Sequence, residues 1–354
     1  MAWTIDDGSA YAQVLSYTGN AGAQSVTFDG YSDLQPDMIW QKNQGANGWH
    51  FYDSSRGVTK DLAFQGDAAE ATWSGWMDSF DSDGITMKTG DSSTNYNGTN
   101  YNIWGWKING GTTTTNNDGN VAVTLQANAT AGISIGLYEG TNTASRTFGH
   151  GLGAIPDMVI FKCRDSGNLG WVVWHHAISP GTAMYLHSTT AAYGIGGTAF
   201  GTFTTSVIEL NAWGPVNGSV ESFMFLAFEG VQGFSKFGTY VGNGNDFGPF
   251  VHTGFQPEII MIKEHDGTAE WLLVDAARAG SNAAANARGN PHIYAHKITG
   301  STYQDAHAKV DLLSNGFKLR STDTLSNGSG DKYVYAAWAK NPFVTSTGVP
   351  CTAV

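Results

Sequence analysis

The sequence predicts an all-β protein built from three tandem, related β-sandwich modules of the jelly-roll or concanavalin-like kind, with little helix. Its apolar runs are short, rich in Val, Ile, Phe, Tyr and Trp, and bounded by Gly, Asn, Asp, Ser or Pro, which is typical of strands. The 354 residues include 46 Gly, about twice the usual share of roughly 7%, and only 14% are charged. A third observation, a motif that occurs three times, indicates the modules.

In that motif a proline opens an apolar run that closes on a lysine six residues later. The three copies read PDMIWQK at 36–42, PDMVIFK at 156–162 and PEIIMIK at 257–263. Each copy follows a Tyr-x-Gly turn that begins at Tyr17, Tyr138 or Tyr240. Because these features keep the same order, we predict modules at residues 1–110, 111–231 and 232–354, the last with a C-terminal tail.

Three further apolar runs follow the lysine in each copy. The first starts at a tryptophan, namely Trp49, Trp171 or Trp271. The next follows a small polar turn and lies at 85–87 and 317–319, with 207–210 as its weaker middle counterpart. The last is the most aromatic and lies at 101–106, 223–228 and 333–338. No stretch of a dozen residues keeps an apolar stripe at helical spacing, and the alanine-rich residues 276–288 predict at most a short helix.

The charge pattern limits the partners. A formal charge of −12 with scattered basic residues argues against nucleic acid, which needs clustered Lys and Arg. Nothing approaches 18 consecutive apolar residues, so we expect no membrane insertion, and the first residues do not resemble a signal peptide. Cys163 and Cys351 are interpreted as one strand thiol and one tail thiol, without a disulfide framework or a zinc spacing.

The search for chemistry predicts no catalytic, cofactor-binding or metal site. Asp53 and Arg56 recur as Asp275 and Arg278, three residues apart after a strand. Such a pair is either a ligand clamp or an ion pair that staples a turn, and we favour the ion pair because the middle copy has His175 instead. Two histidine groups, one of His175, His176 and His187 and the other of His292, His296 and His307, are interpreted as solvent-facing strand and loop residues and not as metal clusters. The acidic residues after the motif proline are interpreted as turn residues; they are Asp37, Asp157 and Glu258.

Aromatic residues make up 12% of the chain and fall into two groups. Those that recur at the same module position are expected in a shared core. Trp73, Trp76 and Trp213 occur in one copy each, so a repeated scaffold does not require them. They are the better candidates for surface binding, together with Asp53, Arg56, Asp275 and Arg278. The copies differ most at 60–78, 189–205 and 279–309, where we expect the residues that carry the function.

Several stretches resemble a repeat of tailed-bacteriophage structural proteins, many from marine hosts. They include FGTYVGNG at 237–244, LSNGFKLR at 313–320 and YVYAAWAKNPF at 333–343 in the third module. FGHGLGAIPD at 148–157 and DSSRGVTK at 53–60 carry the resemblance into the other two modules. The resemblance implies a non-enzymatic virion protein and supplies no catalytic residues.

Two places in the virion fit this resemblance. A head decoration or head-fibre protein would contact the capsid, and a tail-fibre or spike tip would attach to a glycan or receptor on the host surface. Both imply other virion proteins of the capsid or tail as partners, and a homo-oligomer, with a trimer as one expected form. The alternative is a soluble lectin-like carbohydrate-binding protein or a glycan hydrolase, which would need two carboxylates about 5 to 9.5 Å apart in a cleft.

Overall fold

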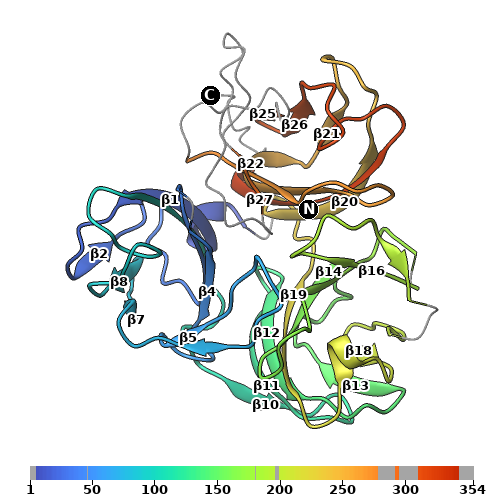
Figure 1. The fold of residues 1–354 in the computed structure, drawn as a ribbon. Helices are drawn as coiled ribbons and strands as arrows, with labels where there is room; N and C mark the ends of the chain where they lie inside the picture. The colour runs from blue at the N-terminus through green and yellow to red at the C-terminus, as the bar shows by residue number, and fades with distance from the viewer. Residues whose placement is uncertain are drawn as a thin grey trace.

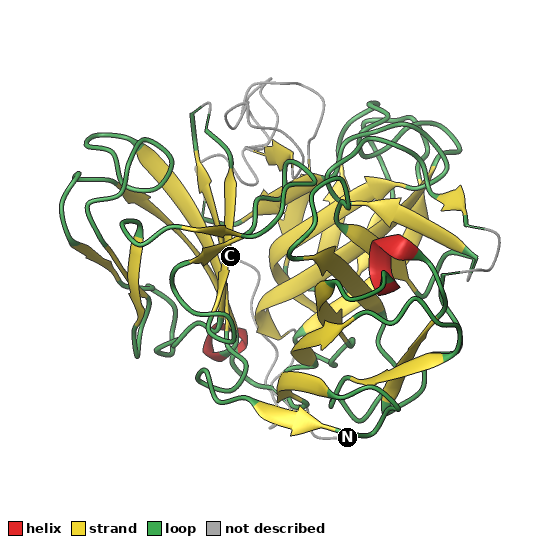
Figure 2. Ribbon diagram, turned by 60° about the horizontal axis from the view of Figure 1, so that its bottom comes forward, coloured by secondary structure: helices red, strands yellow, loops and turns green. Residues whose placement is uncertain are grey.

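The computed structural model describes residues 5–45, 47–179, 181–195, 199–277 and 310–342, with the backbone of 292–294. The prediction of an all-β protein is confirmed, since antiparallel strands and loops make up nearly all of the ribbon (Figure 2). Within these residues, helix is limited to the 3-10 turn η1 (Gly8–Ala10) and to α1 (Gly214–Asn217). The short helix predicted at 276–288 falls almost entirely outside the described residues.

One four-strand order occurs three times. In each case the strand that ends in the Tyr-x-Gly turn pairs with the aromatic strand, which pairs with the Pro-to-Lys strand, which pairs with the Trp strand. The first sheet runs β1 (Ala12–Thr18), β9 (Asn100–Trp106), β3 (Met38–Asn43) and β4 (Trp49–Asp53). The second runs β12 (Ile133–Glu139), β19 (Ser222–Phe228), β14 (Met158–Cys163) and β15 (Val172–His175). The third runs β20 (Ser235–Val241), β27 (Lys332–Pro342), β22 (Phe255–Glu264) and β23 (Leu272–Asp275).

A smaller antiparallel sheet accompanies each of these sheets. The apolar run that follows the Trp strand in each copy is a strand of it, namely β8 (Ile85–Met87), β18 (Val207–Leu210) and β26 (Gly316–Leu319). β8 lies between β2 (Gln24–Val26) and β7 (Met77–Phe80), β18 pairs with β13 (Arg146–Gly149), and β26 lies between β21 (Phe250–His252) and β25 (Val310–Leu313).

The remaining strands extend this plan and differ between the copies. In the middle copy, the hairpin β10 (Thr114–Asn116) and β11 (Val123–Asn128) adds to β12, while β16 (Thr182–Tyr185) and β17 (Tyr193–Gly194) extend the other edge. The first copy has the hairpin β5 (Lys60–Asp61) and β6 (Ala71–Thr72), and in the third copy β24 (His292–Tyr294) adds to β23.

The recurring Tyr-x-Gly turn has the same physical cause in each copy. The tyrosine ring stacks on the aromatic residue that faces it on the next strand, in the pairs Tyr17–Tyr101, Tyr138–Phe223 and Tyr240–Tyr333. Its hydroxyl donates a hydrogen bond to a loop carbonyl at Thr94, Val216 or Ser326. A Cβ on the glycine would approach a backbone oxygen to within 2.5, 1.9 or 2.2 Å at positions 19, 140 and 242. Only glycine fits there.

The three main sheets share one hydrophobic core at the centre of the molecule. Figure 1 shows the three sheet systems, blue, green to yellow, and orange to red, around that centre. Trp106, Phe228 and Trp338 occupy equivalent positions at the ends of the aromatic runs, and the ring of Trp338 lies 5.5 Å from each of the other two. Separate clusters fill the first and second sandwiches. The module boundaries stay a prediction, because the central core crosses all of them.

Hydrogen bonds link each copy to its neighbour. The indole of Trp171 donates to the carbonyl of Ala63 at 2.9 Å, and that of Trp271 donates to the carbonyl of Tyr185 at 2.9 Å. η1 packs on β27, where a Cβ on Gly8 would lie 2.4 Å from the carbonyl oxygen of Ala339. The first copy therefore contacts the third as well as the second, and the arrangement closes on itself.

Candidate functional site

The Asp53 and Arg56 pair lies inside the protein. Both side chains have no exposed surface, and Arg56 donates through Nε to Asp53 and through Nη1 to Glu70 at 3.0 Å. Glu70 also accepts from Nε of Arg164 at 2.9 Å. The network thus runs from β4 through the β5–β6 hairpin into the second copy. Neither Glu70 nor Arg164 was predicted from the sequence, because neither recurs and only the fold brings them to Arg56.

Electrostatics hold this network in its charged form. Burial opposes the charge of Arg56, but attraction to Asp53 and Glu70 outweighs it and raises the pKa of the guanidinium. Burial would raise the pKa of the Glu70 carboxyl, yet hydrogen bonds and attraction from Arg164 and Arg56 lower it. Each charged group in the network pairs with one of opposite charge, so neither guanidinium is free to bind a ligand. This agrees with the interpretation of Asp53 and Arg56 as an ion pair.

Asp275, the residue of the third copy equivalent to Asp53, takes part in a different contact between copies. Asp275 is buried and accepts a hydrogen bond from the indole of Trp104, in the first copy, at 3.2 Å. Arg278 lies outside the described residues. The prediction of a solvent-facing side chain is wrong for His175, at the same position in the middle copy, because it packs against the third copy. His175 is buried, and its Nε2 lies 3.4 Å from the carbonyl oxygen of Tyr335. Asp53, His175 and Asp275 therefore all lie at contacts between copies.

The three candidate tryptophans are not brought together. Trp73 and Trp76 stack with their ring centroids 4.7 Å apart and an angle of 9° between planes, and Trp73 is 46% exposed. Trp76 also packs edge-on against His50. Trp213 is half-buried against Phe200 at the edge of the second sandwich, just before α1. The Trp73 and Trp76 pair is thus a surface feature, whereas Trp213 belongs to the packing of its own sandwich.

The motif lysines are buried and bond to loop carbonyls. Lys42 donates to Asn43 and Asn47 at 2.6 and 2.5 Å, and Lys162 donates to Leu169 and Asp67 at 2.7 and 3.1 Å. Lys263 donates to the carbonyl of Glu264. Burial lowers the pKa of each of the three to about 8. These lysines close the loop after their strand, so the motif that defines the modules is scaffold.

The motif acids lie at three equivalent junctions between copies. Asp37 is fully buried and accepts from the backbone amides of Ile108, Gly110 and Gly111 at 2.6 to 2.9 Å. Asp157 accepts from the amide of Gly230 at 2.7 Å. Both precede their strand and sit in the turn, as predicted.

The turn interpretation is wrong for Glu258. β22 (Phe255–Glu264) begins before the proline, so Glu258 is a strand residue, and its side chain lines a cavity of about 260 Å³. Asp157 lines a second cavity of about 400 Å³ at the junction of the second and third copies. At the first junction, Gln126 of β11 bonds to Ser54, Ser55 and Gly111 instead.

Other sequence signals carry no site in the described part of the chain. No group of three or more His, Cys, Asp or Glu side chains that could hold a metal occurs there. His296 and His307 lie outside it. Cys163 is buried and unpaired with another cysteine. The described residues also include no helix long and apolar enough to cross a bilayer.

Comparison with known families gives one match. A family model described as a domain of unknown function (DUF7483) matches residues 7–342. The chain belongs to this family. No curated protein and no solved structure matches the sequence. The DUF7483 match runs through all three sheet systems, which agrees with the central core that they share.

Within this DUF7483 chain, most residues that recur are used to hold the fold, as the tyrosines, glycines, lysines and aspartates described above illustrate. The features that remain are the exposed Trp73 and Trp76 pair and the two cavities at the junctions between copies. The Trp73 and Trp76 pair lies in a range where the copies differ, whereas each cavity is lined by a motif acid, Glu258 or Asp157.

Proposed function

We propose that this protein is a non-enzymatic structural component on the surface of a tailed-bacteriophage particle. It is either a head decoration or head-fibre protein or the tip of a tail fibre or spike that attaches to the host. The motifs that resemble phage structural proteins are the first support. The second is that Asp53 and Arg56, which lie in one of those motifs, are bound in a buried ion-pair network that reaches the second copy through Glu70 and Arg164.

The single observation that carries the proposal is the closed arrangement around Trp106, Phe228 and Trp338. A common core and joints between all three copies suit a rigid body that holds loops outward on a particle. One chain already places three related sheets around a centre, as a trimeric knob does with three chains. Light scattering after size-exclusion chromatography will establish whether the homo-oligomer, including the trimer expected above, forms in solution.

The location is tested by negative-stain electron microscopy of phage particles with gold-labelled antibody to this chain. Label on the head supports a decoration protein, and label on the tail supports a fibre or spike tip. Particles that carry no label while the free protein is abundant in the lysate would overturn the virion proposal. Pre-incubation of the antibody with purified protein is the control for specificity.

A carbohydrate-binding function is the second candidate, and the Trp73 and Trp76 pair favours it. Sugar rings stack on exposed aromatic faces, and Trp73 presents one face while the other is covered by Trp76. A glycan array with the native protein and the variant W73A tests this function. Binding that W73A abolishes supports a lectin-like role, and an array without signal counts against it.

A further inference from the structure

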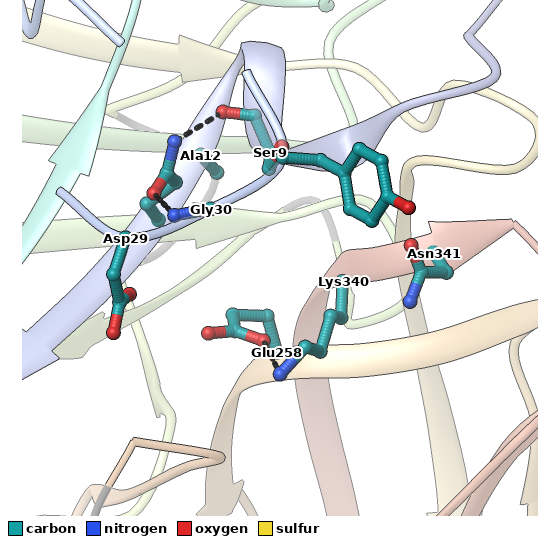
Figure 3. A pocket seen from close by; sticks show the side chains of 9 residues that line it. Ser9, Ala12, Asp29, Gly30, Glu258, Lys340 and Asn341 are labelled. Carbon is teal, nitrogen blue, oxygen red and sulfur yellow. Dashed lines mark hydrogen bonds and ion pairs between the residues drawn. The ribbon is translucent and has the colours of Figure 1, made fainter. Parts of the chain in front are cut away.

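Glu258 lies in a cavity between the third and the first copy. The cavity, called the Glu258 cleft below, is lined by Glu258 and Lys340 from one side and by Asp29, Tyr31 and Gln13 from the other. Figure 3 shows one oxygen of Glu258 directed toward Asp29 across the cavity and the other beside Lys340. The cleft thus collects groups from two distant parts of the chain.

The walls of the cleft are built by specific hydrogen bonds. Gln13 donates through Nε2 to the carbonyls of Ser9 and Ser32 at 2.9 and 2.7 Å, and its Oε1 accepts from the amide of Gly30 at 2.7 Å. Those bonds fix the loop that carries Asp29 and Tyr31. On the other side, Glu258 and Lys340 project from the paired strands β22 and β27. The walls of the cleft are therefore held in place by the protein itself, as a preorganised binding site requires.

The carboxyl of Glu258 is an unusual group for such a wall. The residue is 9% exposed, and Oε2 accepts no hydrogen bond from the described residues. The ammonium of Lys340 faces it from β27, but the Nζ atom is 4.0 Å from Oε2, which is too far for a hydrogen bond. A buried polar atom without a donor costs about 1–3 kcal/mol, which a donor from a ligand would offset.

The charges in the cleft exclude some ligand classes. Two carboxyl groups, those of Asp29 and Glu258, disfavour an anion, and the ammonium of Lys340 beside Glu258 disfavours a metal ion or an amine. What remains is a neutral ligand whose groups both donate and accept. The hydroxyls of a sugar do this, since the carboxyl groups accept from them while Lys340 and Asn341 donate to them.

Size and shape agree with a sugar. The cavity of about 260 Å³ is slightly below the usual range of roughly 300–1,000 Å³ for small-molecule pockets, which suits one ring and not a long chain. Tyr31 is 97% exposed, so its ring offers an open aromatic face beside the cavity. We propose that the Glu258 cleft binds one neutral pyranose unit of a glycan, with Asp29 and Glu258 accepting from its hydroxyls and Lys340 donating.

This inference does not depend on the virion location, and it concerns a different surface from the Trp73 and Trp76 pair. The equivalent cavity at Asp157 offers a comparison inside the same molecule. In that cavity the Asp157 carboxyl already accepts a hydrogen bond from the Gly230 amide at 2.7 Å, so a hydrogen bond from a ligand would stabilise it less. The first junction is filled by Gln126. Of the three junctions, the Glu258 cleft alone combines a cavity with a buried carboxyl oxygen that lacks a donor among the described residues.

The test is saturation-transfer NMR of the purified full-length protein with methyl pyranosides of glucose, galactose, mannose and N-acetylglucosamine. We expect at least one of them to bind, and we expect D29N and E258Q to weaken it by about tenfold or more, because each replaces a carboxyl acceptor with an amide. D246N, the same substitution at an exposed aspartate outside the cleft, is the matched control and should bind like the native protein, while W73A distinguishes the cleft from the Trp73 and Trp76 pair. Asp29 is exposed, so D29N tests the site even if E258Q alters stability.

Each other outcome argues against the inference. If W73A abolishes binding and D29N does not, the sugar lies on the Trp73 and Trp76 pair, which supports the second candidate function and overturns the cleft. If titration calorimetry detects binding of calcium chloride, methylammonium or inorganic phosphate that D29N weakens, and no pyranoside binds, the ligand class is wrong. If none of these probes binds, the cleft is not a ligand site, while the virion proposal is untouched.

Discussion

The indole Nε1 of Trp104 donates a hydrogen bond to Oδ2 of Asp275 across 171 residues of sequence, over a distance of 3.2 Å. Both groups are buried, and they come from the first and third copies. This bond, the Trp171 and Trp271 indole bonds and the Arg56 network together join each copy to another. The stability of the whole chain therefore depends on contacts between the copies as well as on each sandwich.

The contribution of the Trp104 hydrogen bond to stability can be measured by comparison with Trp106 on the same strand. W104F loses both packing and the hydrogen bond, while W106F, two residues along the same strand, loses packing only, since the Trp106 Nε1 has no partner among the described residues. We expect W104F to lower the free energy of unfolding more than W106F does, by about 1.5–3 kcal/mol, because the acceptor is a carboxylate. Urea denaturation followed by tryptophan fluorescence and circular dichroism measures both. Equal losses would show that the bond contributes nothing.

The Arg56 network predicts a large loss on one substitution. R56M leaves the buried Asp53 carboxylate without its cation, which we expect to cost about 3–5 kcal/mol. The double variant D53N/R56M should recover part of that loss, since it removes the stranded charge. K332M is the control. It breaks the ion pair between Lys332 and Asp266, whose side chains are 60% and 35% exposed, so it should change the free energy of unfolding by less than about 1 kcal/mol. A small loss in R56M would mean that water reaches Asp53.

Gly140 predicts a steric effect. In G140A, the new Cβ would lie 1.9 Å from the carbonyl oxygen of Gly218, so the turn after β12 must shift. We expect a loss of about 2–4 kcal/mol, among the large values for a single substitution. G194A is the control, because no described residue other than its chain neighbours lies within 4 Å of its Cβ, and it should be close to neutral. Thermal unfolding by calorimetry compares the two, and a G140A variant as stable as G194A would refute the steric explanation.

Much of the fold could be predicted from the sequence because its signals have local causes. Gly19 and its equivalents avoid a backbone oxygen, Lys42 and its equivalents bond to the next loop, and both features recur at fixed spacing. Strand existence and strand type followed from these signals. The relations between copies could not be predicted, since the partners of Trp104, Glu70 and Trp171 lie in other copies and only the tertiary structure brings them together.

The candidate site was harder to predict for a related reason. In sequence Glu258 resembles Asp37 and Asp157, each of which follows a proline and precedes an apolar run. Yet β22 starts at Phe255, whereas β3 and β14 start after their aspartate, so Glu258 alone is held in a strand. Gln126 of β11 occupies the first junction, whereas the Glu258 junction holds a cavity. One signal was visible, since the third copy has Glu where the others have Asp.

Glu258 finally predicts how stability depends on pH. Burial raises the pKa of its carboxyl to about 7. The positive charge of Lys340 lowers this pKa, and the negative charges of Asp275 and Asp29 raise it. Between the ordinary pKa of 4.5 and this value, the folded protein holds a proton that the unfolded chain has released. The free energy of unfolding therefore falls as pH rises through this window, by about 3 kcal/mol in total from this group. E258Q cannot titrate, so its stability should fall less over the same range. Urea denaturation at several pH values from about 4.5 to 8 measures both proteins, and parallel curves would mean that Glu258 ionises as freely in the folded protein as in water.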